Sequence, residues 1–349
     1  LVVDEGVAVE LIEPAVAGVH AVLGGPEVAA AVGNSMFSDL VSVAGHIYKF
    51  GIDDGLPGAA VSAKIPINVH ADEFNELMGD EFIPMVNKGG GAGTEAFVDG
   101  KLAGNDPHKL VFGTNNEWLL PMVTKAAYAP GDLQPVAAMA MDEFLLWTHA
   151  DAPYENAADF VAKAKEGNMK VGGSQSKDTD QILSKHLEHA TGTKFTYIPF
   201  KSGGEAATQL AGAHLEANFN NPQENVAQWR GGMVRPLCVF SPERMDYKEK
   251  VTDTMSWNDI PTCKEEGIAV EDYKMPRTIW MNAEVPQEAV AYYADVLSKV
   301  REAPEWKEWL ARTSQTDSFL TGEAFTKLVE TEKANARQLF EREGWLVTN

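Results

Sequence analysis

The sequence predicts an α/β protein of two domains with mixed, mostly parallel sheets. Apolar strand segments alternate with amphipathic helices along most of the chain, an order typical of parallel βα units. The chain has 349 residues, 44% of them hydrophobic. This length exceeds the usual size of a single domain and is enough to bury a substantial core. We therefore expect two domains.

The strands are expected where short apolar runs are bounded by turn residues. These runs are residues 7–12, 82–86, 110–113, 134–139, 144–148, 169–172, 196–200, 215–219, 234–240 and 278–282. Helices fill most of the gaps. Pro286 begins one helix with apolar residues at helical spacing from Val290 to Val300, and a second helix runs from Phe325 to Phe340. Residues 36–80 show no assignable pattern, and we find no internal repeat.

Charge excludes two classes of partner. The chain carries 51 acidic and 29 basic residues, a formal net charge of −22, which repels nucleic acid phosphates and anionic lipid head groups. No apolar run approaches the length of a membrane span. Acidic residues and Pro14 interrupt the apolar N-terminal segment, and no basic residue precedes Lys49. That segment lacks the pattern of an export signal, so we read the chain as already processed.

Cysteine usage leaves two readings open. Cys238 and Cys263 are the only cysteines. They are compatible with one disulfide in an oxidising compartment, or with two inert buried thiols. Their spacing does not decide between these readings, because it says nothing about how close the two Cα atoms lie.

Two strand-to-helix turns suggest a site for a small anion. Gly and Ser residues join a strand to a helix in KVGGSQSKDTDQIL and again in IPFKSGGEAATQL. The first N–H groups of a helix have no internal partner, and with the helix dipole they attract anions. Thr114 with Glu117, and Ser202 with Glu205, have the spacing of a capping box. Each turn alone is more simply read as a helix cap; convergence of several turns on one cleft would favour a site.

Signals for catalysis, nucleotides or metals are weak. The glycine cluster at residues 88–94 lacks the Gly-Lys-Ser/Thr ending of a P-loop, so we read it as a tight turn before a helix. His186 and His189 are one turn apart on a helix, but their charged neighbours favour a solvated face over a metal site. His149 with Asp151 is read as a strand end. The chain contains no G-x-S-x-G, H-E-x-x-H or C-x-x-C motif.

The order of several short motifs resembles one protein family. VGGSQSKDTDQILSKHLEHATGT, YIPFKSGGEAATQLAGAHLEANFNN, VRPLCVFSPERM and IPTCKEEGI follow one another as in the Bug-type receptors, the periplasmic substrate-binding proteins of tripartite tricarboxylate transporters. The resemblance also includes VNKGGGAGTEAF, VFGTNN and the two C-terminal helices, and covers roughly Phe82 to Leu346. The specificity of the resemblance lies in the order of these motifs.

This resemblance implies a periplasmic-binding-protein type II-like fold whose cleft closes on a small carboxylate. The chain would cross twice between the domains, which gives domain one residues 1–142 and 276–349, with both termini, and domain two residues 143–275. Cys238 and Cys263 would lie in the same domain. The ligand-binding residues would be Gly18, Thr114, Asn115, Asn116, Ser174, Gln175, Ser176, Lys201, Ser202, Asn220 and Asn221.

The sequence departs from the family pattern near its start. The family loop Pro-Gly-Gly-Gly-x-Asp has its nearest counterpart at residues 13–20, where Gly18 is the one glycine and Asp is absent. The family Phe-Asp-Asn is Phe219-Asn220-Asn221 here. The stretch before Phe82 is also longer than the resemblance implies, which predicts an insertion near the N-terminus.

The function implied is that of an exported, monomeric receptor that delivers a carboxylate to the membrane subunits of the transporter. Neither a metal nor an organic cofactor is expected. Two alternatives stay open. One is a receptor that signals through a sensor kinase, and the other is an enzyme on the same scaffold with His149 or His186 as its base.

Overall fold

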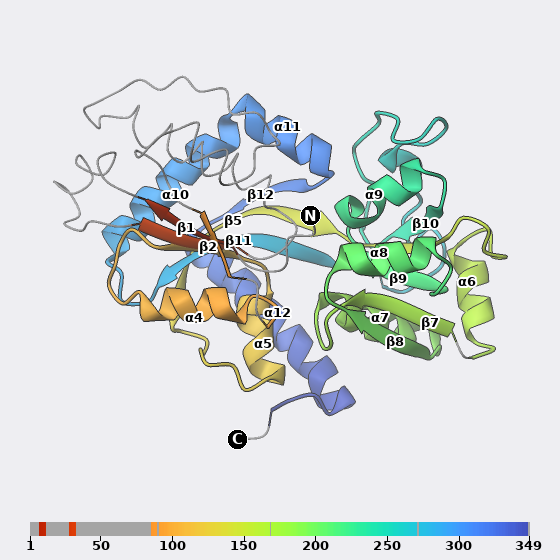
Figure 1. Ribbon diagram of the computed structural model, residues 1–349, viewed down its shortest axis with the longest axis horizontal. Helices are drawn as coiled ribbons and strands as arrows, with labels where there is room; N and C mark the ends of the chain where they lie inside the picture. The colour runs from red at the N-terminus through yellow and green to blue at the C-terminus, as the bar shows by residue number, and fades with distance from the viewer. Residues whose placement is uncertain are drawn as a thin grey trace.

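The structure, a computed structural model, describes the backbone of residues 7–11, 28–32 and 85–88, and residues 91–347 apart from 168 and 271. Its described strands form two sheets, one of seven strands and one of five. Figure 1 shows the two sheets side by side, each with its own helices. We call the seven-stranded sheet with its helices the first lobe and the five-stranded sheet with its helices the second lobe. The expected α/β class is confirmed.

The first lobe is built on a sheet of strand order β12-β5-β11-β4-β2-β1-β3. Its strands are β1 (Val7–Leu11), β2 (Val28–Val32), β3 (Met85–Asn87), β4 (Leu110–Gly113), β5 (Leu133–Glu143), β11 (Lys274–Asn282) and β12 (Thr316–Leu320). Its helices are α4 (Thr94–Leu102), α5 (Asn116–Val123), α10 (Gln287–Glu302), α11 (Pro304–Thr313) and α12 (Gly322–Glu343). The ring of Trp280 on β11 lies 5.9 Å from Trp118 of α5 and 5.0 Å from Phe325 of α12, between centroids. These aromatic contacts hold two helices against the sheet.

The second lobe has the strand order β10-β6-β9-β7-β8. Its strands are β6 (Leu145–His149), β7 (Met169–Ser174), β8 (Phe195–Phe200), β9 (Ala217–Asn220) and β10 (Val234–Val239). Its helices are α6 (Ala157–Ala164), α7 (Thr179–Thr191), α8 (Gly203–Ala211) and α9 (Pro222–Arg230), and a 3₁₀ turn, η1, covers Trp257–Asp259. Helix α7 also touches the first lobe, because Ile182 packs into the core of Trp118 and Trp280.

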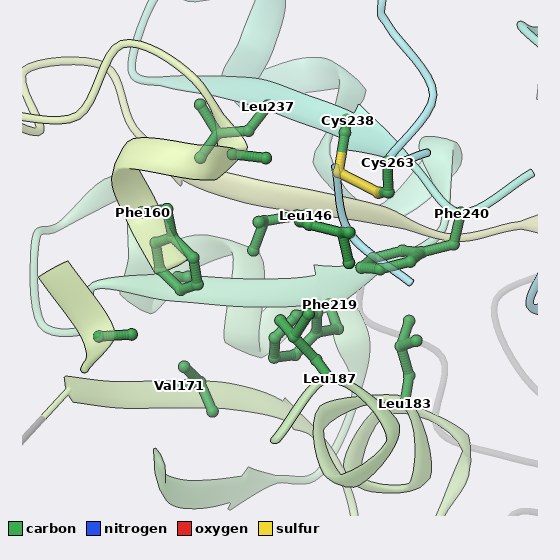
Figure 2. Close-up of a cluster of buried hydrophobic side chains, with 14 of the residues drawn as sticks. Leu146, Phe160, Val171, Leu183, Leu187, Phe219, Leu237, Cys238, Phe240 and Cys263 are labelled. Carbon is green, nitrogen blue, oxygen red and sulfur yellow. A yellow bond between two sulfur atoms is a disulfide. The ribbon is translucent and has the colours of Figure 1, made fainter. Parts of the chain in front are cut away.

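A disulfide lies within the core of the second lobe. Cys238 and Cys263 are bonded, with a Cα–Cα distance of 4.9 Å. Figure 2 shows the bond beside the buried side chains of Leu146, Leu237 and Phe240. The Cys263 N–H donates to the Val239 carbonyl at 2.8 Å, so the segment carrying Cys263 runs along β10. The reading of two free buried thiols is therefore wrong.

Strands β5 and β11 connect the two lobes. They pair antiparallel from Leu133 with Asn282 to Glu143 with Lys274. The chain leaves the first sheet after Glu143, enters β6 at Leu145, and returns to the first sheet at Lys274. The domain limits proposed at residues 142/143 and 275/276 stay a prediction.

The expectation of mostly parallel sheets is wrong, although both sheets are mixed. Parallel neighbours are β2 with β4, β7 with β8, and β7 with β9. The other described strand pairs are antiparallel. The reason is that the crossing strands β5 and β11 run against each other and against β12 and β4, which alternation of strands and helices cannot reveal.

Most expected elements are present. Strand β4 has its expected limits, β1, β3 and the strands of the second lobe fall within a few residues of theirs, and α10 and α12 cover the two expected C-terminal helices. Strands β2 and β12 were not expected, and β5 runs four residues past the expected Met139. The stretch 36–80 and the expected N-terminal insertion lie outside the described residues. In the described part of the chain, no helix combines the length and apolarity that crossing a membrane requires.

Candidate functional site

A cavity of about 60 Å³ lies between the two lobes. The first lobe contributes Thr114, Asn116 and Arg277, and the second contributes Ser174 and Asn221. A water molecule needs roughly 10 to 15 Å³ of such volume, and drug-sized ligands occupy several hundred. The space therefore suits only a small molecule while the lobes hold this position.

Five helices begin at this cavity. Its lining includes the N-cap or first-turn residues of α4, α5, α7, α8 and α9, which are Gly93, Asn116, Asp178, Thr179, Gly203 and Asn221. The N-cap side chains of α5 and α9, Asn115 and Asn221, make no capping hydrogen bond, and the N-cap of α4 is a glycine. The N-termini of five helices and their dipoles converge here, which favours an anion. This is the convergence that distinguishes a site from isolated caps.

The capping boxes expected in the sequence are only partly formed. Ser202 caps α8 by accepting from the Glu205 N–H at 3.2 Å, and the Glu205 carboxylate reaches back to the Lys201 N–H at 3.0 Å. In α5, the Thr114 hydroxyl oxygen accepts from the Asn116 N–H at 3.2 Å. Glu117 is buried instead of exposed at the helix start, and burial raises its pKa to about 8.

Glycines of the first Gly/Ser turn let α7 approach β7 closely. A Cβ added to Gly173 would lie 2.4 Å from the Cβ of Asp180, so a larger residue would push α7 away. The Asp180 carboxylate oxygen Oδ2 accepts from the Ser174 N–H at 2.6 Å and from its hydroxyl at 3.1 Å. The Tyr197 hydroxyl donates to the Ser174 carbonyl at 2.9 Å. Ser174 is thereby fixed at the cavity wall.

Two buried carboxyl groups line the cavity at the start of α7. Burial raises the pKa of Asp178, and hydrogen bonds from Thr179 and Asn116 oppose the shift. Burial raises the pKa of Asp180 well above its usual value, and the charge of Asp178 adds to the shift. Both shifts favour the neutral acid. A neutral carboxyl does not repel an anion and can donate a hydrogen bond to it.

Arg277 is a cavity residue that the sequence analysis did not identify. It lies on β11, and its guanidinium Nη2 donates to Oδ2 of Asp142, the same oxygen that accepts from Asn221 Nδ2 at 2.9 Å. Arg277 is 4% exposed and Asp142 is 1% exposed. The register pairs Arg277 with Ala140 and Met275 with Asp142. The ion pair is thus a diagonal contact between β5 and β11, and only the strand pairing reveals it.

The first Asn of the predicted Asn220-Asn221 pair belongs to a buried amide network. Asn220 Nδ2 donates to the Gly203 carbonyl at 3.0 Å and to Asn225 Oδ1 at 2.9 Å. Asn218 and Asn225 also bond to each other. Asn220 lines the cavity, and its fixed position sets the spacing of α8 and α9.

Five of the expected ligand-binding residues line the cavity, namely Thr114, Asn116, Ser174, Asn220 and Asn221. Five others are placed elsewhere. Asn115 lines a second cavity behind the first. The Gln175 amide donates to the Lys201 carbonyl at 3.1 Å, and the exposed Ser176 donates to Gln181 at 3.3 Å. Lys201 is exposed and Ser202 caps α8. Gly18 lies outside the described residues.

The histidines weighed as metal ligands or bases lie away from the cavity. His189 Nε2 is 2.8 Å from a carboxylate oxygen of Glu343. His186 lines the second cavity, and His149 accepts at Nδ1 from the Asp151 N–H at 3.2 Å. Across the residues that the structure describes, no group of His, Cys, Asp or Glu has the arrangement of a metal site.

Solved proteins share this fold. A solute-binding protein from Polaromonas is 25% identical, with a TM-score of 0.58 over 74% of this chain and 86% of that chain. A Rhodopseudomonas palustris protein solved with adipate is 20% identical, with a TM-score of 0.68 over 78% and 90%. The protein MatC from Rhodopseudomonas palustris, solved with malate, is 18% identical, with a TM-score of 0.56 over 72% and 83%.

Sequence comparison identifies the family. A UPF0065 protein from the TAR-I ttuE-ttuC' intergenic region of Agrobacterium vitis is 21% identical over 247 residues, which cover 67% of this chain and 68% of that protein. Residues 68–344 match the family described as the tripartite tricarboxylate transporter family receptor. The match covers more than half of the chain and extends over both lobes, apart from β1 and β2. The chain therefore belongs to the tripartite tricarboxylate transporter receptor family, TctC.

Proposed function

We propose that this protein is a periplasmic receptor that binds a small carboxylate between its lobes and delivers it to the membrane subunits of a tripartite tricarboxylate transporter. The observation that carries the proposal is the convergence of five helix N-termini on one cavity lined from both lobes. Family membership supports the receptor role. The ligands of two structural relatives, adipate and malate, support the ligand class.

The proposed binding mode assigns separate tasks to backbone and side chains. First-turn N–H groups and the hydroxyls of Thr114 and Ser174 bind carboxylate oxygens, because hydrogen bonds to a charged acceptor are about twice as strong as neutral ones. The Asn116 and Asn221 amides either donate or accept at the rest of the ligand. The receptor acts as a monomer and without a cofactor. The two lobes correspond to domains with limits at 142/143 and 275/276.

Calorimetric titration of the purified chain with adipate, malate, citrate and the uncharged succinamide tests the ligand class. We expect binding of at least one carboxylate and none of succinamide. The Asn116→Ala variant changes the cavity wall and should bind more weakly, whereas Asn335→Ala, on the exposed face of α12, should bind as the wild type does. Failure of all three carboxylates to bind would contradict the proposal.

A further inference from the structure

Arg277 is distinctive among the residues around the cavity. Of the described residues that line it, Arg277 alone has a cationic side chain, whereas Asp178, Asp180 and Glu224 are acidic. Its Nε is buried and has no hydrogen-bond partner. A guanidinium has five N–H donors, of which Asp142 takes one at Nη2. The side chain thus faces the cavity with donor capacity that the protein does not use.

The Arg277–Asp142 pair is not explained by stability alone. Burying both charges carries a large desolvation cost, and well-packed apolar residues often serve a fold equally well at such a place. Asp142 is held from two sides, by Arg277 and by Asn221. Because Arg277 and Asn221 line the cavity and Asp142 does not, the carboxylate lies behind the guanidinium and orients it. This arrangement is that of a preorganised anion contact.

The cavity has two ends along β11. Met275 and Arg277 both line it and lie on the same face of the strand, about 7 Å apart at the usual rise per residue. Met275 Sδ is 4.0 Å from the hydroxyl of Thr179, the first residue of α7. Arg277 connects through Asp142 to Asn221, the N-cap of α9. The end of the cavity near Met275 is thus formed by helix N-termini, and the end near Arg277 also carries the full positive charge of the guanidinium.

We propose that Arg277 is the specificity-determining residue of this receptor: it binds a second carboxylate of the ligand and makes the protein prefer short dicarboxylates over otherwise identical monocarboxylates. This inference rests on the proposed function. The first carboxylate is bound at the helix N-termini beside Thr179, and the second lies against the guanidinium. Burial raises the pKa of Asp178 and of Asp180, which lessens their repulsion of an anion in the cavity.

The test compares each diacid with its half-amide, which has nearly the same shape and one charge less. Succinate and adipate are titrated against succinamate and adipamate by calorimetry. A charge-assisted hydrogen bond changes affinity by about tenfold or more, so the wild type should favour a diacid by at least that factor. Arg277→Gln alone leaves Asp142 buried without its partner, so the double variant Arg277→Gln/Asp142→Asn is used to remove both charges together.

The double variant should bind a diacid and its half-amide within about twofold of each other. Arg277→Lys keeps the charge and should retain part of the preference. Arg244→Gln removes an exposed arginine that is paired with Glu265 and does not line the cavity. This variant should behave as the wild type does. Thermal melting confirms that each variant is folded.

The outcomes separate the two proposals. If the wild type binds none of the carboxylates, the receptor function itself fails and this inference with it. If the wild type binds them but shows no preference for diacids, or if the double variant keeps the preference, Arg277 is not the specificity residue and the receptor function stands.

Discussion

The side chains of Asn115 and Thr179 join the two lobes: the Thr179 hydroxyl donates a hydrogen bond to Asn115 Oδ1 at 3.3 Å. Asn115 is the N-cap of α5, and Thr179 is the first residue of α7, so the contact links helices from different sheets. Thr179 lines the small cavity, and Asn115 lines a second cavity of about 760 Å³ behind it. The pair therefore forms a wall between them. The Tyr273 hydroxyl donates to the Thr179 carbonyl at 2.7 Å and supports this wall.

We predict that Asn115 and Thr179 act as a coupled pair in ligand binding. Thr179→Val removes the donor and Asn115→Ala removes the acceptor, and each should weaken carboxylate binding because the lobes lose a contact that joins them in this structure. A double-mutant cycle on calorimetric affinities should give a coupling of about 1 kcal/mol. Thr208→Val is a matched control, since the Thr208 hydroxyl bonds only within α8, to Gly204. Additive effects of the two substitutions would show that the bond plays no part in binding.

The two serines of the Gly/Ser turn are predicted to differ. Ser174 lines the cavity, so Ser174→Ala should weaken carboxylate binding by about tenfold, the usual effect of losing a hydrogen bond to a charged group. Ser176 is exposed and its hydroxyl bonds to Gln181, so Ser176→Ala should leave the affinity unchanged. Calorimetry with the same ligand measures both. Equal effects of the two variants would mean that the turn rearranges when the ligand binds.

The disulfide should contribute to stability mainly through the unfolded chain. Cys238 and Cys263 are 25 residues apart, and closing a loop of that length restricts the unfolded state by about 3 kcal/mol. Urea unfolding of the Cys238→Ala/Cys263→Ala variant should therefore show a free energy of unfolding lower by about that amount. The wild type in reductant should approach the variant, and reductant should not affect the variant. A variant as stable as the wild type would show that the covalent link adds little to the core around it.

Local sequence patterns located some strands of this fold and did not reveal others. Strand β4 was predicted to the residue because a short buried run is followed directly by Gly113 and a helix start. Strand β12 was missed because TDSFL is largely polar at the edge of its sheet, and β2 was missed because VAAAV is rich in alanine, which is depleted in strands. The disulfide stayed undecided because the 4.9 Å between its Cα atoms depends on the path of residues 240–262.

The sequence revealed the cavity residues that lie in strand-to-helix turns, but not the arginine that lies inside a strand. Thr114, Asn116, Ser174 and Asn221 stand at strand-to-helix junctions, which local sequence reveals, and all four line the cavity. Their role in binding stays a prediction. Arg277 was missed because it lies inside a strand, and its partner Asp142 is 135 residues away. Only the register of β5 with β11 brings the two together. Ser202 caps α8 and Lys201 is exposed in this structure, and a role for either residue in ligand binding stays a prediction.

The buried Glu117 and the partly buried Glu332 should make stability depend on pH. Burial raises the pKa of Glu117 and of Glu332 from 4.5 to about 8 in each case. Between about pH 4.5 and pH 8 the folded state holds protons that the unfolded state has released, so the free energy of unfolding falls as the pH rises through this window. The stabilising effect is complete below the unfolded pKa and is lost as the pH passes the folded pKa.

Glu117→Gln and Glu332→Gln imitate the neutral acid, so each should gain stability relative to the wild type between pH 5 and pH 8, on the order of a few kcal/mol. Urea unfolding at both pH values measures this. Glu341→Gln, at an exposed position of α12, should show no such change. Parallel stability curves for Glu117→Gln and the wild type would contradict the assignment of a neutral Glu117.

Ligand binding is expected to shift the protein towards the closed arrangement of the lobes. A ligand moves such an equilibrium only through contacts that the open state lacks, and the cavity supplies them from Thr114 and Asn116 on one side and from Ser174 and Thr179 on the other. Small-angle scattering should give a smaller radius of gyration with a bound carboxylate than without it. Asn116→Ala should bind more weakly and, at equal occupancy, close less, because Asn116 also contacts Asp178 across the lobes. Asn335→Ala on α12 should follow the wild type. Suppose that calorimetry confirms binding but the scattering curve does not change. Then either the free protein is already closed or the ligand does not bridge the lobes. Comparing the radius of gyration of the free protein with that of the present structure would separate these two cases.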